Sequence, residues 1–470
     1  ADLNEAIRLD PRSSRVFNAR GAVWAKMGVN DKALADFNAA IKLDPAYALA
    51  YQNRAGVWLL LGKFDKTIED AGAALDLDPS LAMAYINRGA AWSNKGLHEQ
   101  ALADLDEAIR LSPQEPQAYS NRGSAATECK RFEQALRDLN EAIRLDPKLG
   151  DAYVNRSRYW LFQSEYQKAF ADAETAIRLD PADFQAFSNR SKARLGLKHY
   201  SEAIEDATEA IRLGAIAGDI YDTRGAARLV TGDAEGAVSD FNTALQLNSK
   251  DVYAFSSRGS AWFKIGDYQK AAEDHSRAIK LDPTATSYNN RGFAYSRMGQ
   301  FDKAIADYNS ALKIDSKDLT PLWNRIAARI EQRRYDKAIK DLTLILWREP
   351  QNPHALEKRA LLHAACPDPE SRDGKQAVTD ATRLCELSNW QHAEGLNVLA
   401  AAYAESGNFR KAVEFQTKAI ELAGDETARA KFEANLKLYK HRQPYRLHPD
   451  EEVQILPTSG EKEDEEPSIK

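Results

Sequence analysis

An arginine recurs along this chain almost every 34 residues, and an aspartate follows nearly every one of these arginines by 16 residues. The arginines are Arg20, Arg54, Arg88, Arg122, Arg156, Arg190, Arg224, Arg258, Arg291, Arg325 and Arg359, and the aspartates are Asp36, Asp70, Asp104, Asp138, Asp172, Asp206, Asp240, Asp274, Asp307, Asp341 and Asp380. One residue is lost before Arg291, and five are gained between Arg359 and Asp380. A period this regular predicts a stack of similar units, so domains cannot be counted from length alone.

Small and apolar residues keep the same period at helical spacing. In the third full unit, Tyr85, Gly89 and Trp92 lie on one face of a first helix, while Ala101 and Leu105 begin the buried face of a second. A proline that ends the second helix recurs at Pro11, Pro45, Pro79, Pro113, Pro147, Pro181 and Pro283. The pattern predicts an all-α chain of helix-turn-helix repeats without a β-sheet.

These features resemble the tetratricopeptide repeat (TPR) family. The aromatic residue at the fourth position, the small residue at the eighth, the alanine at the twentieth and the closing proline all match its pattern. Units that read Asn-Arg-Gly, as at Asn87–Gly89, resemble bacterial TPR proteins, and so does the ending of the chain, through residues 407–423 and 443–446. The resemblance implies an α–α superhelix, the TPR solenoid, of about twelve repeats.

The repeat boundaries predict the following organisation. We expect the second helix of a truncated repeat at 1–13, ten TPR repeats at 14–352, a TPR-like repeat with a loop insertion at 353–392, the last TPR repeat at 393–424, a capping helix at 425–443, and a disordered acidic tail at 444–470. Because the chain opens on a second helix, we also expect the natural protein to begin before residue 1.

The arginine and the aspartate depart from the TPR pattern that the chain otherwise resembles. That pattern has a leucine at the seventh position and an aromatic residue at the twenty-third. In the last repeat those two positions are Leu399 and Phe415, so both polar residues are replaced together by an apolar pair. The two positions are about equally far from the turn of the hairpin, which predicts contact within each repeat, including Arg359 with Asp380. Fixing the helix register is the proposed role, since such pairs add little net stability. The alternative is a set of scattered surface charges.

Several classes of function are disfavoured by composition and motif. A formal net charge of −6 gives no general attraction to nucleic acid or anionic membranes, and no apolar run approaches the roughly 20 residues of a membrane helix. Cys129, Cys366 and Cys385 lack zinc spacing. Cys366 and Cys385 flank the insertion and could approach each other, although two small core residues are the favoured interpretation. No catalytic or nucleotide-binding motif occurs, so we predict no enzyme activity, cofactor or metal.

The resemblance implies that first helices line a concave groove, with the sixth position facing inward. That position is an asparagine in seven repeats: Asn53, Asn87, Asn121, Asn155, Asn189, Asn290 and Asn324. A row of amides can donate to and accept from the backbone of an extended peptide. This row is similar to the asparagine row of O-GlcNAc transferases. A chaperone-type carboxylate clamp is disfavoured, because the basic residues that it needs at position 2 are missing. The alternative interpretation is solvated asparagines left from repeat duplication.

Two stretches of the predicted groove differ from the rest. A basic patch suited to an acidic peptide comes from Arg158 and Lys192. An aromatic stretch, some of which could pack between helices, comes from Tyr253, Phe263, Phe293 and Trp323, with Arg297 nearby. Other tryptophans recur at position 11 and are predicted to be core residues: Trp24, Trp58, Trp92, Trp160 and Trp262.

The leading functional hypothesis is a non-enzymatic scaffold or adaptor that binds extended peptides or partner proteins in its groove. The alternative is a regulatory or substrate-docking arm of a kinase or transferase whose catalytic domain lies outside this chain. A third reading is an envelope-associated adaptor. We expect a protein or peptide partner, no nucleic acid and no membrane insertion. The chain is expected to be soluble, and either cytoplasmic or periplasmic depending on what precedes residue 1.

Overall fold

The computed structural model describes residues 2–447, which fall into two compact units that meet between residues 232 and 233 of the sequence. The first unit contains α1 (Asp2–Leu9), α2 (Ser14–Lys26), α3 (Asn30–Leu43), α4 (Ala48–Leu60), α5 (Phe64–Leu77), α6 (Ala82–Asn94), α7 (His98–Leu111), α8 (Pro116–Glu128), α9 (Phe132–Leu145), α10 (Gly150–Phe162), α11 (Tyr166–Leu179), α12 (Phe184–Gly196), α13 (Tyr200–Arg212) and α14 (Gly218–Val230).

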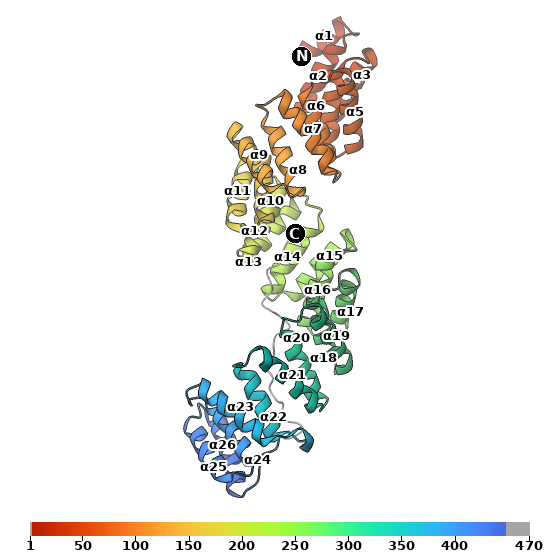
Figure 1. The fold of residues 1–470 in the computed structure, drawn as a ribbon. Coiled ribbons are helices and arrows are strands. Elements are labelled where there is room, and N and C mark those ends of the chain that lie inside the picture. Colours follow the sequence, from red (N-terminus) through yellow and green to blue (C-terminus); the bar gives the residue numbers. More distant parts are fainter. Residues whose placement is uncertain (1, 448–470) are drawn as a thin grey trace. The chain divides into compact units, whose positions relative to one another are not determined.

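The second unit continues with the same kind of element. It contains α15 (Ala234–Leu247), α16 (Val252–Ile265), α17 (Tyr268–Leu281), α18 (Ala285–Arg297), α19 (Phe301–Ile314), α20 (Thr320–Glu331), α21 (Tyr335–Arg348), α22 (Pro353–Ala365), the 3₁₀ turn η1 (Pro369–Ser371), α23 (Gly374–Leu387), α24 (Ala393–Glu405), α25 (Phe409–Glu421) and α26 (Glu426–Lys440). Residues 2–447 contain no β-strand. The all-α helix-turn-helix prediction is therefore confirmed (Figure 1).

Within each unit, a first helix packs along the second helix that follows it, as α6 does along α7 and α18 along α19 (Figure 1). The small residue at the eighth position explains how closely they approach. A Cβ atom added to Gly123 would lie 2.6 Å from Cγ of Leu139 and 3.1 Å from the carbonyl oxygen of Ala135. Only a residue without a side chain leaves room there for the leucine of the second helix.

The predicted arginine–aspartate pairs form within each repeat. In all ten pairs whose members share one unit, Nε of the arginine donates to Oδ2 and Nη2 donates to Oδ1, over 2.6–2.9 Å. The fork geometry is the one that guanidinium and carboxylate prefer. Arg359 reaches Asp380 across the insertion in the same way. Arg224 and Asp240 belong to different units, so the structure leaves that pair as a prediction.

The same guanidinium groups also reach backwards, which the sequence had not indicated. Nη1 of Arg54 donates to Oδ1 of Asn38 over 2.7 Å, and Nη1 of Arg156 donates to Asn140 over 2.8 Å. Both acceptors lie on the second helix of the preceding repeat. Equivalent bonds join further arginines to Asn4, Asp106, Thr208, Asn242, Ser276, Asn309 and Thr343. Each such arginine whose aspartate lies in the same unit therefore joins three helices from two consecutive repeats.

The position-11 tryptophans pack against the buried clusters but are only half-buried. A lysine eight residues further along covers the ring in four of the five. The ammonium nitrogen of Lys66 lies 4.3 Å from the ring centroid of Trp58, and that of Lys270 lies 4.2 Å from Trp262. The pairs Lys32–Trp24 and Lys168–Trp160 are similar, at 4.5 and 4.6 Å. Each of these four rings therefore packs against a buried cluster and is also covered by a lysine ammonium group.

The end of the second unit replaces the ion pair by other contacts. Leu399 is fully buried and packs with Phe415, as the apolar pair of the last repeat predicts. The amide of Gln416 donates to Oδ1 of Asn397 and to the carbonyl oxygen of Phe432, at 3.1 and 3.0 Å. Phe432 lies on α26, so the buried amide fastens this last helix to the hairpin that it covers.

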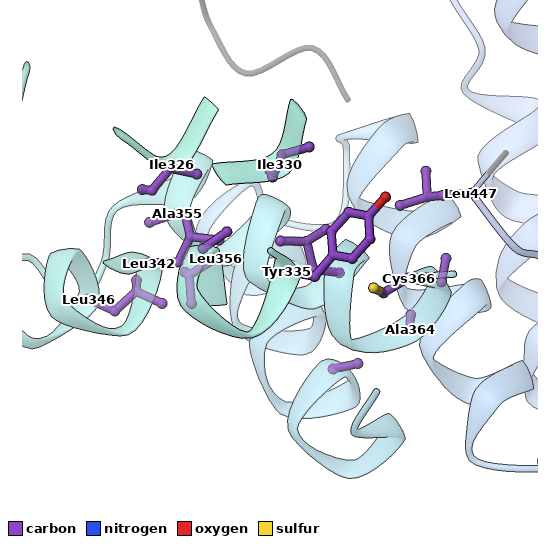
Figure 2. Packing of buried hydrophobic residues seen from close by; sticks show 14 of the residues in the cluster. Ile326, Ile330, Tyr335, Leu342, Leu346, Ala355, Leu356, Ala364, Cys366 and Leu447 are labelled. Carbon is purple, nitrogen blue, oxygen red and sulfur yellow. The ribbon is translucent and has the colours of Figure 1, made fainter. Parts of the chain in front are cut away.

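The two cysteines beside the insertion are buried and remain free thiols. Burial raises the pKa of Cys366 to about 11 and that of Cys385 to about 12, so neither thiol is reactive at neutral pH. The interpretation of two small core residues is confirmed. The predicted tail lies outside the described residues except for 444–447. Those four residues are packed, since Leu447 is only 7% exposed within the cluster shown in Figure 2.

Candidate functional site

The asparagines predicted to line the groove are largely engaged between neighbouring repeats. Nδ2 of Asn189 donates to the carbonyl oxygen of Val154 over 3.0 Å, and Nδ2 of Asn155 donates to Oγ of Ser120 over the same distance. In each case the acceptor lies 35 residues earlier, on the first helix of the preceding repeat. Asn53, Asn87 and Asn324 make the equivalent bond, to Asn18, Gln52 and Asn289.

The remaining two asparagines make more local contacts. Asn121 accepts a hydrogen bond from Nε2 of Gln117, one turn earlier in α8, over 3.1 Å. Asn290 accepts one from its neighbour Asn289 over 3.4 Å. The row is thus a seam between first helices, because most of its amide donors are already used by the protein. Its use by a peptide stays a prediction that the structure does not test.

Removing one of these seam amides should lower stability. We expect Asn189→Ala to destabilise the packing of α12 on α10 by about 1 kcal/mol, because the buried hydrogen bond from its amide to the Val154 carbonyl oxygen is lost. Asn121→Ala is the matched control, since that amide bonds within its own helix, and its effect should stay below about 0.5 kcal/mol. Thermal melting of the two variants beside the wild type measures the difference. Equal melting temperatures would contradict the seam.

The predicted basic patch is paired with carboxylates from adjacent repeats. Nη2 of Arg158 lies 2.7 Å from Oε1 of Glu128, and Nζ of Lys192 forms an ion pair with Asp219. Burial raises the pKa of the Asp219 carboxyl, but Lys192, the backbone amide of Ile220 and Arg158 together lower it by more, so the resulting pKa lies below its ordinary value. The two cations therefore already have anionic partners, so the patch is not the free positive surface that the sequence suggested.

The aromatic stretch of the second unit is brought together around one ring. Phe263 of α16 stacks on Phe293 of α18, with ring centroids 4.9 Å apart and planes 24° from parallel. Phe263 also contacts Tyr268, at 5.1 Å, and the guanidinium of Arg297 lies 5.4 Å from the Tyr268 centroid. Phe263 and Phe293 are half-buried, whereas Arg297 is exposed. We call Phe263, Phe293, Tyr268 and Arg297 the aromatic patch.

The other two aromatic residues of the prediction lie apart from that stack. Trp323 of α20 is half-buried and packs against the cluster around Leu322 and Ile326. Tyr253 stands at the start of α16 and is 37% exposed. Tyr268 was missed by the sequence reasoning. The sequence does contain a pattern that could have predicted its packing role, because the first residue of the second helix is aromatic in most repeats. These residues are Phe64, Phe132, Tyr166, Tyr200, Tyr268, Phe301, Tyr335 and Phe409.

The described part of the chain offers no obvious inorganic site. Among residues 2–447, no three His, Cys, Asp or Glu side chains are grouped so that they could hold a metal ion. Over the same residues, no helix combines the length and the apolar character needed to cross a membrane.

Comparison with protein families finds three models, each described as a tetratricopeptide repeat. One matches residues 116–149 and 285–318, a second matches 61–116 and 223–286, and a third matches 393–426. The matched segments coincide with helix pairs of both units. No curated protein matches the sequence.

Several solved structures share the repeat fold. The TPR protein YrrB is 22% identical and aligns over 39% of this chain and 95% of its own, with a TM-score of 0.35. PilF of Pseudomonas aeruginosa is 19% identical over 44% of this chain and 94% of its own, with a TM-score of 0.40. Yeast Tom70 is 14% identical over 91% of this chain and 96% of its own, with a TM-score of 0.34. At these levels the likeness concerns the fold alone.

Proposed function

Because this chain is a tetratricopeptide repeat protein, we propose that it is a non-enzymatic interaction scaffold that binds an extended peptide of a partner protein at the aromatic patch of its second unit. The observation that carries this proposal is the stacked pair Phe263 and Phe293, half-exposed beside Arg297. Aromatic and arginine side chains are the residues on which binding energy most often concentrates in protein interfaces.

The patch differs from the same positions elsewhere in the chain. Phe293 occupies position 9, where the first unit carries Arg158 and Lys192, and both of those are already held by carboxylates. Arg297 is exposed, and its guanidinium lies over a tyrosine ring, with no carboxylate within salt-bridge distance among the described residues. Apolar surface and an available cation therefore stand together at the aromatic patch.

That combination favours a particular kind of peptide. The rings offer a surface for an aliphatic or aromatic side chain, and burying it would remove apolar area from water at about 25 cal/mol per Å². The guanidinium of Arg297 can hold a carboxylate in a two-pronged hydrogen bond. We therefore propose a peptide with an acidic residue close to a bulky apolar one.

Peptide selection tests the proposal. A displayed random library is panned on the full chain, and one selected peptide is titrated against variants. Phe293→Ala should weaken binding by about ten-fold or more, and Arg297→Ala by a similar factor that shrinks as salt rises. Asn121→Ala and Arg158→Ala are controls from the first unit and should leave the affinity unchanged.

The melting temperature of each variant separates loss of binding from loss of fold. Arg297→Ala is the sharper variant, because its side chain is exposed and its removal should not disturb packing. A selected peptide that binds Phe293→Ala and Arg297→Ala as well as it binds the wild type would refute the patch. Loss in the Arg158→Ala control alone would move the site to the first unit.

A further inference from the structure

The first helix α22 ends differently from the other first helices. Most of those helices close in a turn whose residue has positive φ, such as Gly62 at 67°, Lys130 at 58° or Gly407 at 78°. Such a turn folds the chain back over the last carbonyl groups of the helix. The residue after α22 is Cys366, with φ −51° and ψ 137°, so the chain leaves in an extended conformation and enters the insertion.

The inserted loop satisfies only part of that helix end. The last four carbonyl groups of a helix have no partner within it. Here the carbonyl oxygen of Leu362 accepts from the amide of Cys366 over 3.1 Å, and that of His363 accepts from the amide of Asp373 over 3.0 Å. Two carbonyl groups, those of Ala364 and Ala365, are left for partners from outside the repeat.

Residues 444–447 supply both of the missing donors. The amide of Leu447 donates to the carbonyl oxygen of Ala365 over 2.8 Å. Nη1 of Arg446 donates to the carbonyl oxygen of Ala364 over 3.3 Å, across 82 residues of sequence. The insertion and this distant segment therefore complete the end of α22 between them.

One carboxylate fastens the loop and the segment together. Glu405, the last residue of α24, forms an ion pair with Arg446 at 2.6 Å and with Arg372 of the loop at 3.1 Å. Nη1 of Arg372 in turn donates to the carbonyl oxygen of Cys366 over 3.0 Å. Loss of the segment would leave Glu405 with a single cationic partner.

The leucine fills an apolar site beside these polar contacts. Leu447 is 7% exposed and belongs to the buried cluster that includes Ile330, Tyr335 and Cys366. Figure 2 shows its side chain next to Tyr335 and Cys366, on the side away from Ile326. The backbone amide of Leu447, the side chain of Arg446 and the side chain of Leu447 thus all bind at the end of α22, in the way that a short linear motif binds a receptor.

We propose that the end of α22, Glu405 and the inserted loop form a docking site for an extended Arg-Leu segment, and that residues 444–447 occupy it as a releasable clasp. The segment follows a turn at Arg442 with φ 56°, and it is held by one backbone hydrogen bond, by Arg446, and by the side chains of Leu447 and Tyr445, which pack in the same cluster. Arg446 keeps 34% of its side chain exposed, which leaves it accessible to competition. A partner segment with an arginine followed by an aliphatic residue has the matching chemistry.

Hydrogen exchange of the full chain with a competing peptide tests this. Leu447→Asp should open the clasp, and amides of residues 366–373 should then exchange about ten-fold faster or more. A five-residue peptide with the sequence of residues 443–447, Gln-Pro-Tyr-Arg-Leu, should restore their protection in the variant and should not bind the wild type, whose site is filled. The same peptide with glutamate in place of arginine is the control and should restore nothing.

A second variant keeps the test decisive. If Leu447→Asp loses helicity, Arg446→Glu carries the same two measurements, because it repels Glu405 and leaves the apolar contact in place. Unchanged exchange of residues 366–373 in a folded variant would overturn the clasp. Peptide that fails to restore protection, or that binds the wild type as tightly as the variant, would overturn the docking site.

Discussion

Replacing Arg88 by leucine is expected to lower the free energy of opening of α6 and α7 by about 3 kcal/mol, because Asp104 is left as a buried, unpaired carboxylate. The Arg88 side chain is 25% exposed and that of Asp104 10%, so solvent screens the pair only in part. Arg88 suits this test, since the residue facing its Nη1 is Gly72 and no third bond is lost. Native-state hydrogen exchange of the two helices measures the change.

The double variant Arg88→Leu with Asp104→Phe should recover at least half of that loss. It copies the apolar pair of the last repeat, where Leu399 packs against Phe415. The double variant also lacks the buried, unpaired carboxylate of Asp104, whose desolvation cost is what destabilises the single variant. A double variant no more stable than Arg88→Leu alone would show that the pair is not an isolated, exchangeable unit of the hairpin.

His275 should make the second unit sensitive to acid. It lies in α17 at a position where most other repeats carry leucine, phenylalanine or alanine, and Nδ1 finds no hydrogen-bond partner among the described residues. Burial, with a smaller contribution from the Arg291 guanidinium, lowers the pKa of His275 to about 4. An unfolded histidine titrates near 6.5, so between about pH 6.5 and 4 the unfolded chain binds the proton more readily. Stability is therefore full above this window and falls within it, by roughly 3 kcal/mol.

Replacement by leucine isolates this contribution. His275→Leu should flatten that part of the pH profile, as Leu105 and Leu139 occupy the same position without a titrating group. Urea denaturation of variant and wild type at pH 7 and pH 4.5 gives the comparison, because all other titrating groups are the same in both proteins. A loss of stability on acidification that is equal in the two proteins would contradict a neutral, buried His275.

The repeat period was sufficient to predict the helices and the partner of ten of the eleven arginines, and the Arg224 pair stays a prediction. Both depend on contacts inside one hairpin, whose geometry repeats with the sequence. The count of inserted residues even indicated that Arg359 would reach Asp380 across a longer loop. Local spacing is well determined by sequence when each unit repeats the same turn.

Contacts between repeats were harder to predict. Whether Asn189 faces solvent or donates to Val154 depends on how closely two first helices approach, and the sixth position alone does not show this. The ion pairs of Arg158 and Lys192 depend likewise on carboxylates in neighbouring repeats. The docking of Leu447 on α22 joins segments that share no period at all. Non-local contacts of this kind leave no regular trace in a sequence.

The location of the bound peptide tests the functional proposal most directly. Hydrogen exchange of the full chain, measured with and without a saturating selected peptide, reports which helices become protected. We predict slower exchange in α16 and α18, the helices that carry Phe263, Phe293 and Arg297, and no change in α4 to α12. Protection confined to α4–α12, with α16 and α18 unaffected, would contradict it.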